Sequence, residues 1–300
     1  MDREFLVGVD LTPSQINVGL VDLNGKVIKK MTLPTEAEKG KKRVVENIFN
    51  AVTKVSKPKV VGIGVSVPGQ VSRDRGYVLN SPDLNWTEVP LRRLIEEKLK
   101  LPVFIENDSN CFALAEFKCG EGNKMKNMIG LIIGNSIGSG VIVDGKLFRG
   151  CADAAGEIGH TVVDADGPKC SCGNNGCLEG FVSERSIINA YKASKGKIKN
   201  PTLQSISEAS RNGDEKAKEA IRTASRYLGI GLANIVNVFN PELIVVSGSI
   251  PHTKEIFDPA VKEFQKRALK HSASRVRISH SNLEDAGILG AASVVMKGFY

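Results

Sequence analysis

The feature that most constrains the fold of this 300-residue chain is a pattern of strands and turns that occurs twice. The first copy has apolar runs over residues 6–10 and 16–21, separated by a break at 12–14, and a third run at 27–28 after an Asn-Gly turn. The second copy runs through 129–133, 141–143 and 147–148. Asn-Gly and Asp-Gly between extended runs are typical of β-hairpins. The sequence therefore predicts two related half-domains, each built on its own sheet.

Helical and extended segments alternate through the rest of the chain. Further strands are predicted over 60–67, 103–106, 243–246 and 276–279. Helices are predicted over 42–55, 91–99, 183–195, 202–212, 214–239, 258–271 and 285–295. Another helix should follow residue 107, begin with a cap at Asp108 or Ser109, and reach Lys118. This alternation predicts an α/β protein with mixed sheets covered by helices.

The composition is that of a globular protein, with 41% hydrophobic and 25% charged residues. The apolar runs are far shorter than the roughly 20 residues that cross a bilayer, and no signal-like stretch follows residues 1–4. We therefore expect a cytoplasmic protein without a membrane partner. The net charge of +8 is dispersed among acidic residues, and its densest cluster, residues 39–43, opens a predicted helix. Mixed charge of this kind indicates a solvated surface rather than a nucleic-acid site.

Three of the six cysteines, Cys170, Cys172 and Cys177, lie within eight residues on a glycine-rich loop, and His160 lies ten residues upstream. Three thiolates and one imidazole favour tetrahedral Zn²⁺, and four protein ligands leave no open position for a reactive water. The sequence thus predicts a structural zinc site. The alternative is a reduced, metal-free loop with a coincidental histidine. The isolated thiols are expected to act as small buried hydrophobes: Cys111, Cys119 and Cys151.

Carboxylates supply the next candidates. Asp108 follows a predicted strand end, where it could accept the proton of a substrate hydroxyl that attacks a phosphoryl group. Its alternative role is the helix cap. Glu157 and His160 bracket a short turn and could hydrogen-bond vicinal hydroxyls, and Glu179 follows the last cysteine of the loop.

Together these segments resemble the ROK family of sugar kinases and sugar-responsive repressors. The resemblance is carried by Ile105–Asn110, Ala154–His160, Cys170–Glu179, Val236–Glu242 and Glu284–Gly290. It implies the actin-like (ribonuclease-H-like) ATPase fold, with two lobes around a central cleft and the zinc loop in the second lobe. The expected lobes are residues 1–118, with the C-terminal helix 285–300 packing back on it, and residues 119–284. A homo-oligomer, dimer or tetramer, is also expected from the family.

The resemblance also implies residue roles. Asp108 matches the catalytic base that activates a sugar hydroxyl. The remaining positions that match sugar contacts are Gly69, Asn107, Glu157, His160 and Glu179. The positions on the nucleotide side are Asp10, Ser14, Gly134, Ser136, Gly138 and Gly248. In this family the histidine both contacts sugar and ligates zinc, with one ring nitrogen for each task.

The turns on the nucleotide side depart from the family pattern. Where a kinase has Asp-Leu-Gly-Gly-Thr-Lys, this chain has Asp10-Leu-Thr-Pro-Ser-Gln15, and Pro13 lacks the amide donor that a phosphate would use. Gly134-Asn-Ser136 replaces Gly-Thr-Gly, and Ser247-Gly-Ser249 replaces the Gly-Gly of the adenosine side. All these changes affect positions that match nucleotide contacts, which indicates weakened, altered or lost nucleotide use.

Two hypotheses follow. The first is an ATP-dependent, glucokinase-like sugar kinase that phosphorylates a hexose or an N-acetylhexosamine, with ATP and Mg²⁺ held near Asp10 and the turn 134–138. The second is a non-catalytic, regulatory sugar-binding protein. Because the first strand begins by Leu6, we expect no helix-turn-helix and no direct DNA binding. The retained Asp108 and sugar-side residues favour the kinase.

Overall fold

The computed structural model describes residues 4–296, which fall into two compact units. The first unit contains the described residues up to Gly130, the segment Gly140–Gly156 and the described residues from Ser281 onward. The second contains Leu131–Ser139 and Glu157–His280. The predicted lobe boundaries at 118 and 284 stay a prediction. Residues 1–3 and 297–300, at the two ends of the predicted first lobe, lie outside the described residues.

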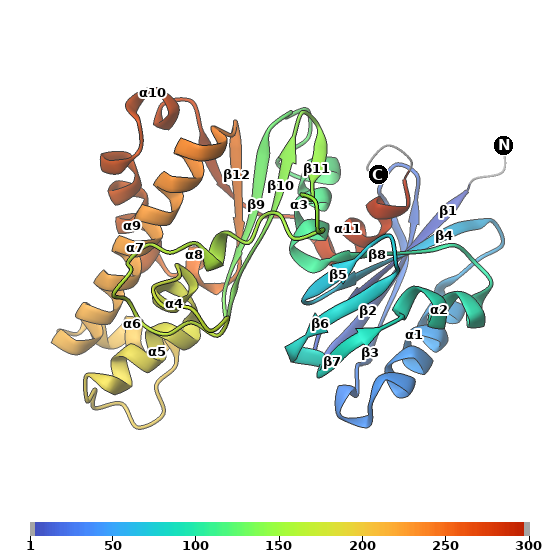
Figure 1. Cartoon of the computed structure of the whole chain (residues 1–300), viewed down its shortest axis with the longest axis horizontal. Helices are drawn as coiled ribbons and strands as arrows, with labels where there is room; N and C mark the ends of the chain where they lie inside the picture. Colours follow the sequence, from blue (N-terminus) through green and yellow to red (C-terminus); the bar gives the residue numbers. More distant parts are fainter. Residues whose placement is uncertain (1–3, 297–300) are drawn as a thin grey trace. The chain divides into compact units, whose positions relative to one another are not determined.

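A five-stranded sheet in the order β3-β2-β1-β4-β8 forms the centre of the first unit (Figure 1). Its strands are β1 (Phe5–Leu11), β2 (Gln15–Asp22), β3 (Val27–Pro34), β4 (Val60–Val67) and β8 (Val103–Asn107). The first three form the predicted antiparallel meander, and β4 and β8 add to it in parallel. The predicted meander and the predicted strands over 60–67 and 103–106 are confirmed.

The two faces of this sheet are covered by different helices, because side chains alternate along a strand. The helices are α1 (Lys41–Val55), α2 (Leu91–Leu99), α3 (Asp108–Cys119) and α11 (Ala286–Val295). Val7 and Val9 of β1 belong to one core cluster with the apolar residues of α1, whereas Leu6 packs with Ile288 of α11. Gly8 allows this approach, since a Cβ there would lie 2.0 Å from the Ile288 carbonyl oxygen.

A small antiparallel sheet in the first unit was missed by the sequence analysis. It consists of β5 (Gln70–Ser72), β6 (Tyr77–Ser81) and β7 (Trp86–Val89), with the 3-10 turn η2 (Pro82–Leu84) between β6 and β7. Another 3-10 turn, η1 (Ala37–Lys39), lies between β3 and α1. Strands of three to five residues carry too few side chains for an alternating pattern to stand out. Their buried residues are Val71, Val78, Ser81, Trp86 and Val89.

The second five-stranded sheet has the order β11-β10-β9-β12-β13. Its strands are β9 (Met128–Ile133), β10 (Ile137–Val143), β11 (Lys146–Phe148), β12 (Leu243–Ser247) and β13 (Arg277–His280). The hairpin formed by β10 and β11 confirms the second copy of the predicted pattern. The unit division passes through β9 and β10, whose residues 131–139 belong to the second unit.

Helices make up most of the second unit. They are α4 (Glu179–Val182), α5 (Glu184–Ala193), α6 (Leu203–Arg211), α7 (Glu215–Phe239), α8 (Ser249–His252), α9 (Lys254–Arg267) and α10 (Lys270–Ala273), with the 3-10 turn η3 (Ile158–His160). The long apolar α7 packs against α9 and α6. The prediction of one helix over 258–271 is wrong at both ends, because α9 accommodates Pro259 inside it and the extended backbone of Ala268 ends it. Among the described residues, no helix has the length and apolar character to cross a membrane.

Candidate functional site

The first unit presents Asn107 and Asp108 where β8 passes into α3. The Asn107 side-chain oxygen accepts hydrogen bonds from the amides of Ser109 and Asn110 at 2.9 and 3.1 Å, so Asn107 is the helix cap. The prediction that Asp108 or Ser109 caps this helix is therefore wrong. Asp108 is instead the first helical residue, where its carboxylate accepts from the Ser109 amide at 2.8 Å and from the Asn107 side-chain amide at 3.0 Å.

The carboxyl group of Asp108 has a raised pKa. Burial raises its pKa to about 6, hydrogen bonds from Ser109 offset part of that rise, and the negative charge of Asp10 adds to it. Burial also raises the pKa of Asp10, whereas hydrogen bonds with Asn17 and Ser66 lower it. The Asn17 side-chain amide donates to Asp10 at 3.1 Å. A carboxylate with a pKa near 6 is mostly ionised at pH 7 and accepts a proton more readily than an ordinary aspartate.

Gly69 joins this group through its backbone. Its carbonyl oxygen accepts a hydrogen bond from the Asn107 side-chain amide at 3.0 Å. Its φ is 100°, and a Cβ there would lie 2.3 Å from the Asn80 carbonyl oxygen. The local backbone thus requires glycine, in addition to the approach to sugar that the family resemblance implies.

A buried ion pair beneath this group was missed by the sequence analysis. Glu106 and Arg149 have side chains only 1% and 9% exposed, and Arg149 Nε lies 2.7 Å from Glu106 Oε2. The other oxygen of Glu106 accepts from the Asn107 amide at 3.0 Å and from the Asn110 side chain at 2.9 Å. Glu106 thereby holds the turn that carries Asp108. An acidic residue at the end of an apolar strand was the available signal, since a buried charge requires a partner.

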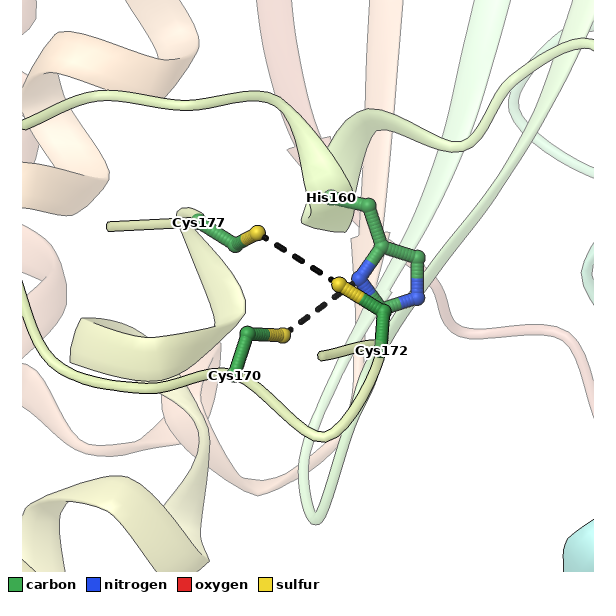
Figure 2. A group of neighbouring side chains, drawn as sticks. All are labelled: His160, Cys170, Cys172 and Cys177. Atoms are coloured by element: carbon green, nitrogen blue, oxygen red, sulfur yellow. Dashed lines mark hydrogen bonds between the residues drawn. The ribbon is translucent and has the colours of Figure 1, made fainter. Parts of the chain in front are cut away.

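The second unit brings the four predicted zinc ligands together. His160, Cys170, Cys172 and Cys177 point toward one another, and their ligand atoms all lie within 4.8 Å of each other (Figure 2). His160 Nδ1 is 3.6 Å from Cys170 Sγ, and the Sγ atoms of Cys172 and Cys177 are 3.7 Å apart. Tetrahedral zinc, with Zn–S of about 2.3 Å and Zn–N of about 2.0 Å, separates its ligands by about 3.5–3.8 Å. The cluster therefore fits a closed zinc site.

The loop reaches this geometry through its glycines. Gly173 and Gly176 have φ values of 94° and 71°, and a Cβ on Gly176 would lie 1.6 Å from the Asp164 carbonyl oxygen. Burial, with hydrogen bonds to its neighbouring thiols, raises the pKa of Cys177 to about 12. Such a thiol stays protonated at neutral pH unless a metal displaces its proton. Outside the cluster, Cys111 is buried as expected, but Cys151 is exposed, so the prediction of burial is wrong for that residue, which lies in a surface turn.

Glu157 and Glu179 take different positions beside the cluster of His160 and the three cysteines. Glu157 Oε2 is 4.0 Å from His160 Nε2, the ring nitrogen opposite the one that faces the thiols. Glu179 is buried, and its carboxylate accepts from the Ser171 hydroxyl and from the Ile137 amide, both at 3.0 Å. Glu179 therefore connects the cysteine loop to the start of β10.

The first predicted phosphate turn is closed on itself. The Thr12 hydroxyl accepts the Gln15 amide at 3.0 Å and donates to the Gln15 carbonyl at 2.8 Å. Pro13 has no amide hydrogen, and the Ser14 carbonyl accepts from the Thr35 amide at 3.0 Å. Pro13, Ser14 and Gln15 are exposed. The turn thus offers an incoming phosphate fewer amide donors than a glycine-containing turn would.

The turns predicted to be the second phosphate turn and the adenosine-side turn both lie in the second unit. Gly134 donates its amide to the Ser136 carbonyl at 3.0 Å, Ser136 is exposed, and Gly138 is partly buried. Gly248, between Ser247 and Ser249, has a φ of 97°. A Cβ on Gly248 would lie 2.3 Å from the Ile133 carbonyl oxygen, so the turn 247–249 lies against the end of β9.

Comparison with known proteins identifies the family. A model described as the ROK family matches residues 6–297. The chain belongs to the ROK family. Within it, a xylose repressor of Caldicellulosiruptor bescii is 34% identical, and the match covers 97% of this chain and 78% of the repressor. A glucokinase of Thermotoga maritima is 33% identical, with 98% of each chain covered.

Solved ROK structures show the same architecture. A ROK family glucokinase from Streptomyces griseus, in complex with glucose and AMPPNP, has a TM-score of 0.79 and 29% identity, covering 97% of this chain and 98% of that one. The predicted two-lobe actin-like α/β fold is confirmed. The ROK family includes carbohydrate kinases, and the chain shares nearly its whole length with both kinases and repressors.

Proposed function

We propose that this ROK protein is an ATP-dependent sugar kinase that phosphorylates a hexose or an N-acetylhexosamine. The observation that carries the proposal is Asp108, held at the start of α3 with a pKa raised to about 6. Phosphoryl transfer to a sugar requires such a base near the attacking hydroxyl. Nearly full-length similarity to a glucokinase supports the same activity.

In the proposed reaction, the sugar hydroxyl oxygen attacks the γ-phosphorus of ATP while its proton passes to the Asp108 carboxylate. The bond from phosphorus to the bridging oxygen of ADP breaks. Mg²⁺, when bound, would neutralise charge on the phosphate oxygens, and Asp10 is the carboxylate proposed to hold it. Asn107 donates to Asp108 at 3.0 Å and so fixes the direction of the basic oxygen.

In the second unit, zinc is proposed to hold His160 through Nδ1, which leaves Nε2 for a sugar hydroxyl. Fixing one ring nitrogen on a metal defines the tautomer and orientation of the other. Glu157, 4.0 Å from Nε2, and the buried Glu179 are the proposed companion sugar contacts. Zinc thus has a structural role with a consequence for sugar affinity.

The second candidate is a non-catalytic, regulatory sugar-binding protein. One specific observation favours it: the first phosphate turn uses its Gln15 amide within the turn, and Pro13 supplies none. A protein that binds sugar without ATP would show this pattern. The similarity to a xylose repressor is in line with such a role.

A coupled assay decides between the two candidates. ATP and Mg²⁺ are offered with a panel of hexoses and N-acetylhexosamines, and ADP release is followed, while calorimetry records sugar and ATP binding separately. Sugar-dependent ADP release supports the kinase. Sugar binding without turnover, together with no heat of binding when ATP is titrated, would overturn the kinase proposal and support the second candidate.

A further inference from the structure

Three segments of the second unit meet at the end of β9. The Gly134 carbonyl oxygen accepts a hydrogen bond from the Glu184 amide at 2.8 Å, which brings the first turn of α5 to this strand end. The turn after β12 arrives at the same place, because Gly248 lies against the Ile133 carbonyl. The strands β9 and β12 are neighbours in the sheet. Crevices outside the carboxyl ends of neighbouring strands are where open α/β sheets bind ligands.

One carboxylate lies at this strand end. The Ser249 hydroxyl donates to Glu184 Oε1. A Cβ on Gly134 would lie 3.7 Å from Ser249 Oγ and 4.0 Å from Glu184 Oε1. The backbone at Gly134 therefore lies next to the Glu184–Ser249 pair. Glu184 is partly exposed, and within the described part of the chain no donor contacts its other oxygen, Oε2.

The Glu184–Ser249 pair at the end of β9 favours one class of ligand. An ionised carboxylate only accepts hydrogen bonds, so it suits a neutral group that offers hydroxyl donors and repels a phosphate. The adjacent cation, Arg185, lies 3.8 Å from Glu179 Oε1, which directs its charge toward the cysteine loop. Ser249 is also fixed through its backbone, because its carbonyl accepts from the Thr253 hydroxyl at 3.0 Å. The end of β9 thus offers a fixed hydrogen-bond acceptor, the Glu184 carboxylate, beside the turns at Gly134 and Gly248.

We propose that Glu184 binds the ribose hydroxyls of the phosphoryl-donor nucleotide and that Ser249 positions its carboxylate. The adjacent ribose hydroxyls can donate hydrogen bonds to a carboxylate that has a free oxygen. In dinucleotide-binding folds an acidic residue accepts a hydrogen bond from a ribose hydroxyl in the same way. The inference rests on the proposed function, since the nucleotide is the donor of that reaction. It assigns to the nucleotide side a side-chain contact formed by Glu184, whose amide bonds to the altered turn at Gly134, and by Ser249 of the altered turn after β12.

The test compares ATP with 2′-deoxy-ATP and 3′-deoxy-ATP, each with Mg²⁺, by calorimetry on the full chain. Wild type should bind at least one deoxy analogue about tenfold or more weakly than ATP, as expected when a charged hydrogen-bond partner is lost. In Glu184→Ala, the ratio of the Kd for the deoxy analogue to the Kd for ATP should fall to within about twofold. Glu215→Ala is the matched control, because Glu215 is the first residue of α7 as Glu184 is of α5. This control should keep the wild-type ratio.

Two results would overturn the inference: equal affinity of wild type for all three nucleotides, or a Glu184→Ala ratio equal to that of wild type. If Glu184→Ala does not fold, Glu184→Gln and Ser249→Ala replace it, and both should lower the ratio while the far-ultraviolet circular dichroism stays unchanged. Failure here is distinct from failure of the kinase proposal. Sugar-dependent ADP release with an unaltered ratio overturns only the role of Glu184, whereas absence of turnover with every sugar overturns the kinase.

Discussion

Arg149 Nε lies 2.7 Å from Glu106 Oε2, and both side chains are almost completely buried. The pair joins the end of β8 to the segment that follows β11. Because the other oxygen of Glu106 holds the Asn107 amide at 3.0 Å, the ion pair supports the backbone that presents Asp108. The base proposed for catalysis therefore depends on a charge pair that has no contact with the sugar in the proposed mechanism.

Replacement of Arg149 by Met should strongly destabilise the protein. Removing one partner leaves the Glu106 carboxylate buried without its counter-charge, which costs about 3–5 kcal/mol. The denaturation midpoint in urea measures the loss. Arg93→Ala is the matched control, because the Arg93–Glu97 pair has side chains 75% and 58% exposed, and its removal should cost about 0.5 kcal/mol or less. Equal midpoints for the two variants would contradict a stabilising role for the buried pair.

Asp108→Asn should lower kcat by about 10²–10⁴-fold with little change in sugar affinity, because it removes the proton acceptor and keeps the side-chain shape. In wild type, kcat/KM for the sugar should fall as pH drops below about 6, the value to which burial raises the Asp108 pKa. Initial rates between pH 5 and 8 measure both effects. A pH profile without a decline near 6, or an active Asp108→Asn variant, would assign the base elsewhere.

The same substitution should increase stability at neutral pH. Folding raises the pKa of Asp108 from 3.8 to about 6, so the folded chain binds more protons than the unfolded chain between those values. Stability is therefore lost as pH rises through about 6, and Asn avoids that loss. Asp108→Asn should be more stable than wild type at pH 8 by up to about 3 kcal/mol, less any screening by water. The difference should vanish near pH 3.5; a constant difference across this range would argue against the raised pKa.

Much of the fold could be predicted because strong local patterns carried it. The meander of β1 to β3 and the hairpin of β10 and β11 were marked by apolar runs and Asn-Gly or Asp-Gly turns. The sheet of β5 to β7 was not, since its strands are short. The cap of α3 was misplaced by one residue because Asn107, Asp108 and Ser109 are all good caps, and only the backbone decides among them.

In the candidate site, too, the features with a local sequence pattern could be predicted and those formed by distant residues could not. The cluster of His160 and three cysteines was predictable because these four metal-ligating side chains lie within 18 sequence positions, and their spacing limits the geometry. The Glu106–Arg149 and Glu184–Ser249 contacts join residues 43 and 65 positions apart, and no local pattern links such pairs. Tertiary contacts of this kind require the folded chain.

Metal analysis should find about one zinc per chain. Cys177→Ser should reduce that content by at least half, because the buried Cys177 thiolate completes the tetrahedral set. Cys151→Ser, which changes an exposed cysteine outside the cluster, should retain full zinc content and serves as the control. Zinc removal by a chelator should lower both the thermal midpoint and sugar affinity. Unchanged sugar affinity in zinc-free, folded protein would limit the metal to stability.

Restoring glycines in the first turn should strengthen nucleotide binding. In the double variant Thr12→Gly/Pro13→Gly, the Gln15 amide loses its Thr12 partner and residue 13 gains an amide donor. One added hydrogen bond to phosphate, about 1.5 kcal/mol, would lower KM for MgATP about tenfold. Asn24→Gly, in the turn between β2 and β3, controls for added flexibility and should leave KM unchanged. An unchanged KM in the double variant would show that this turn does not limit nucleotide use. Turnover by the double variant alone, with none by wild type, would assign the natural chain to the non-catalytic candidate.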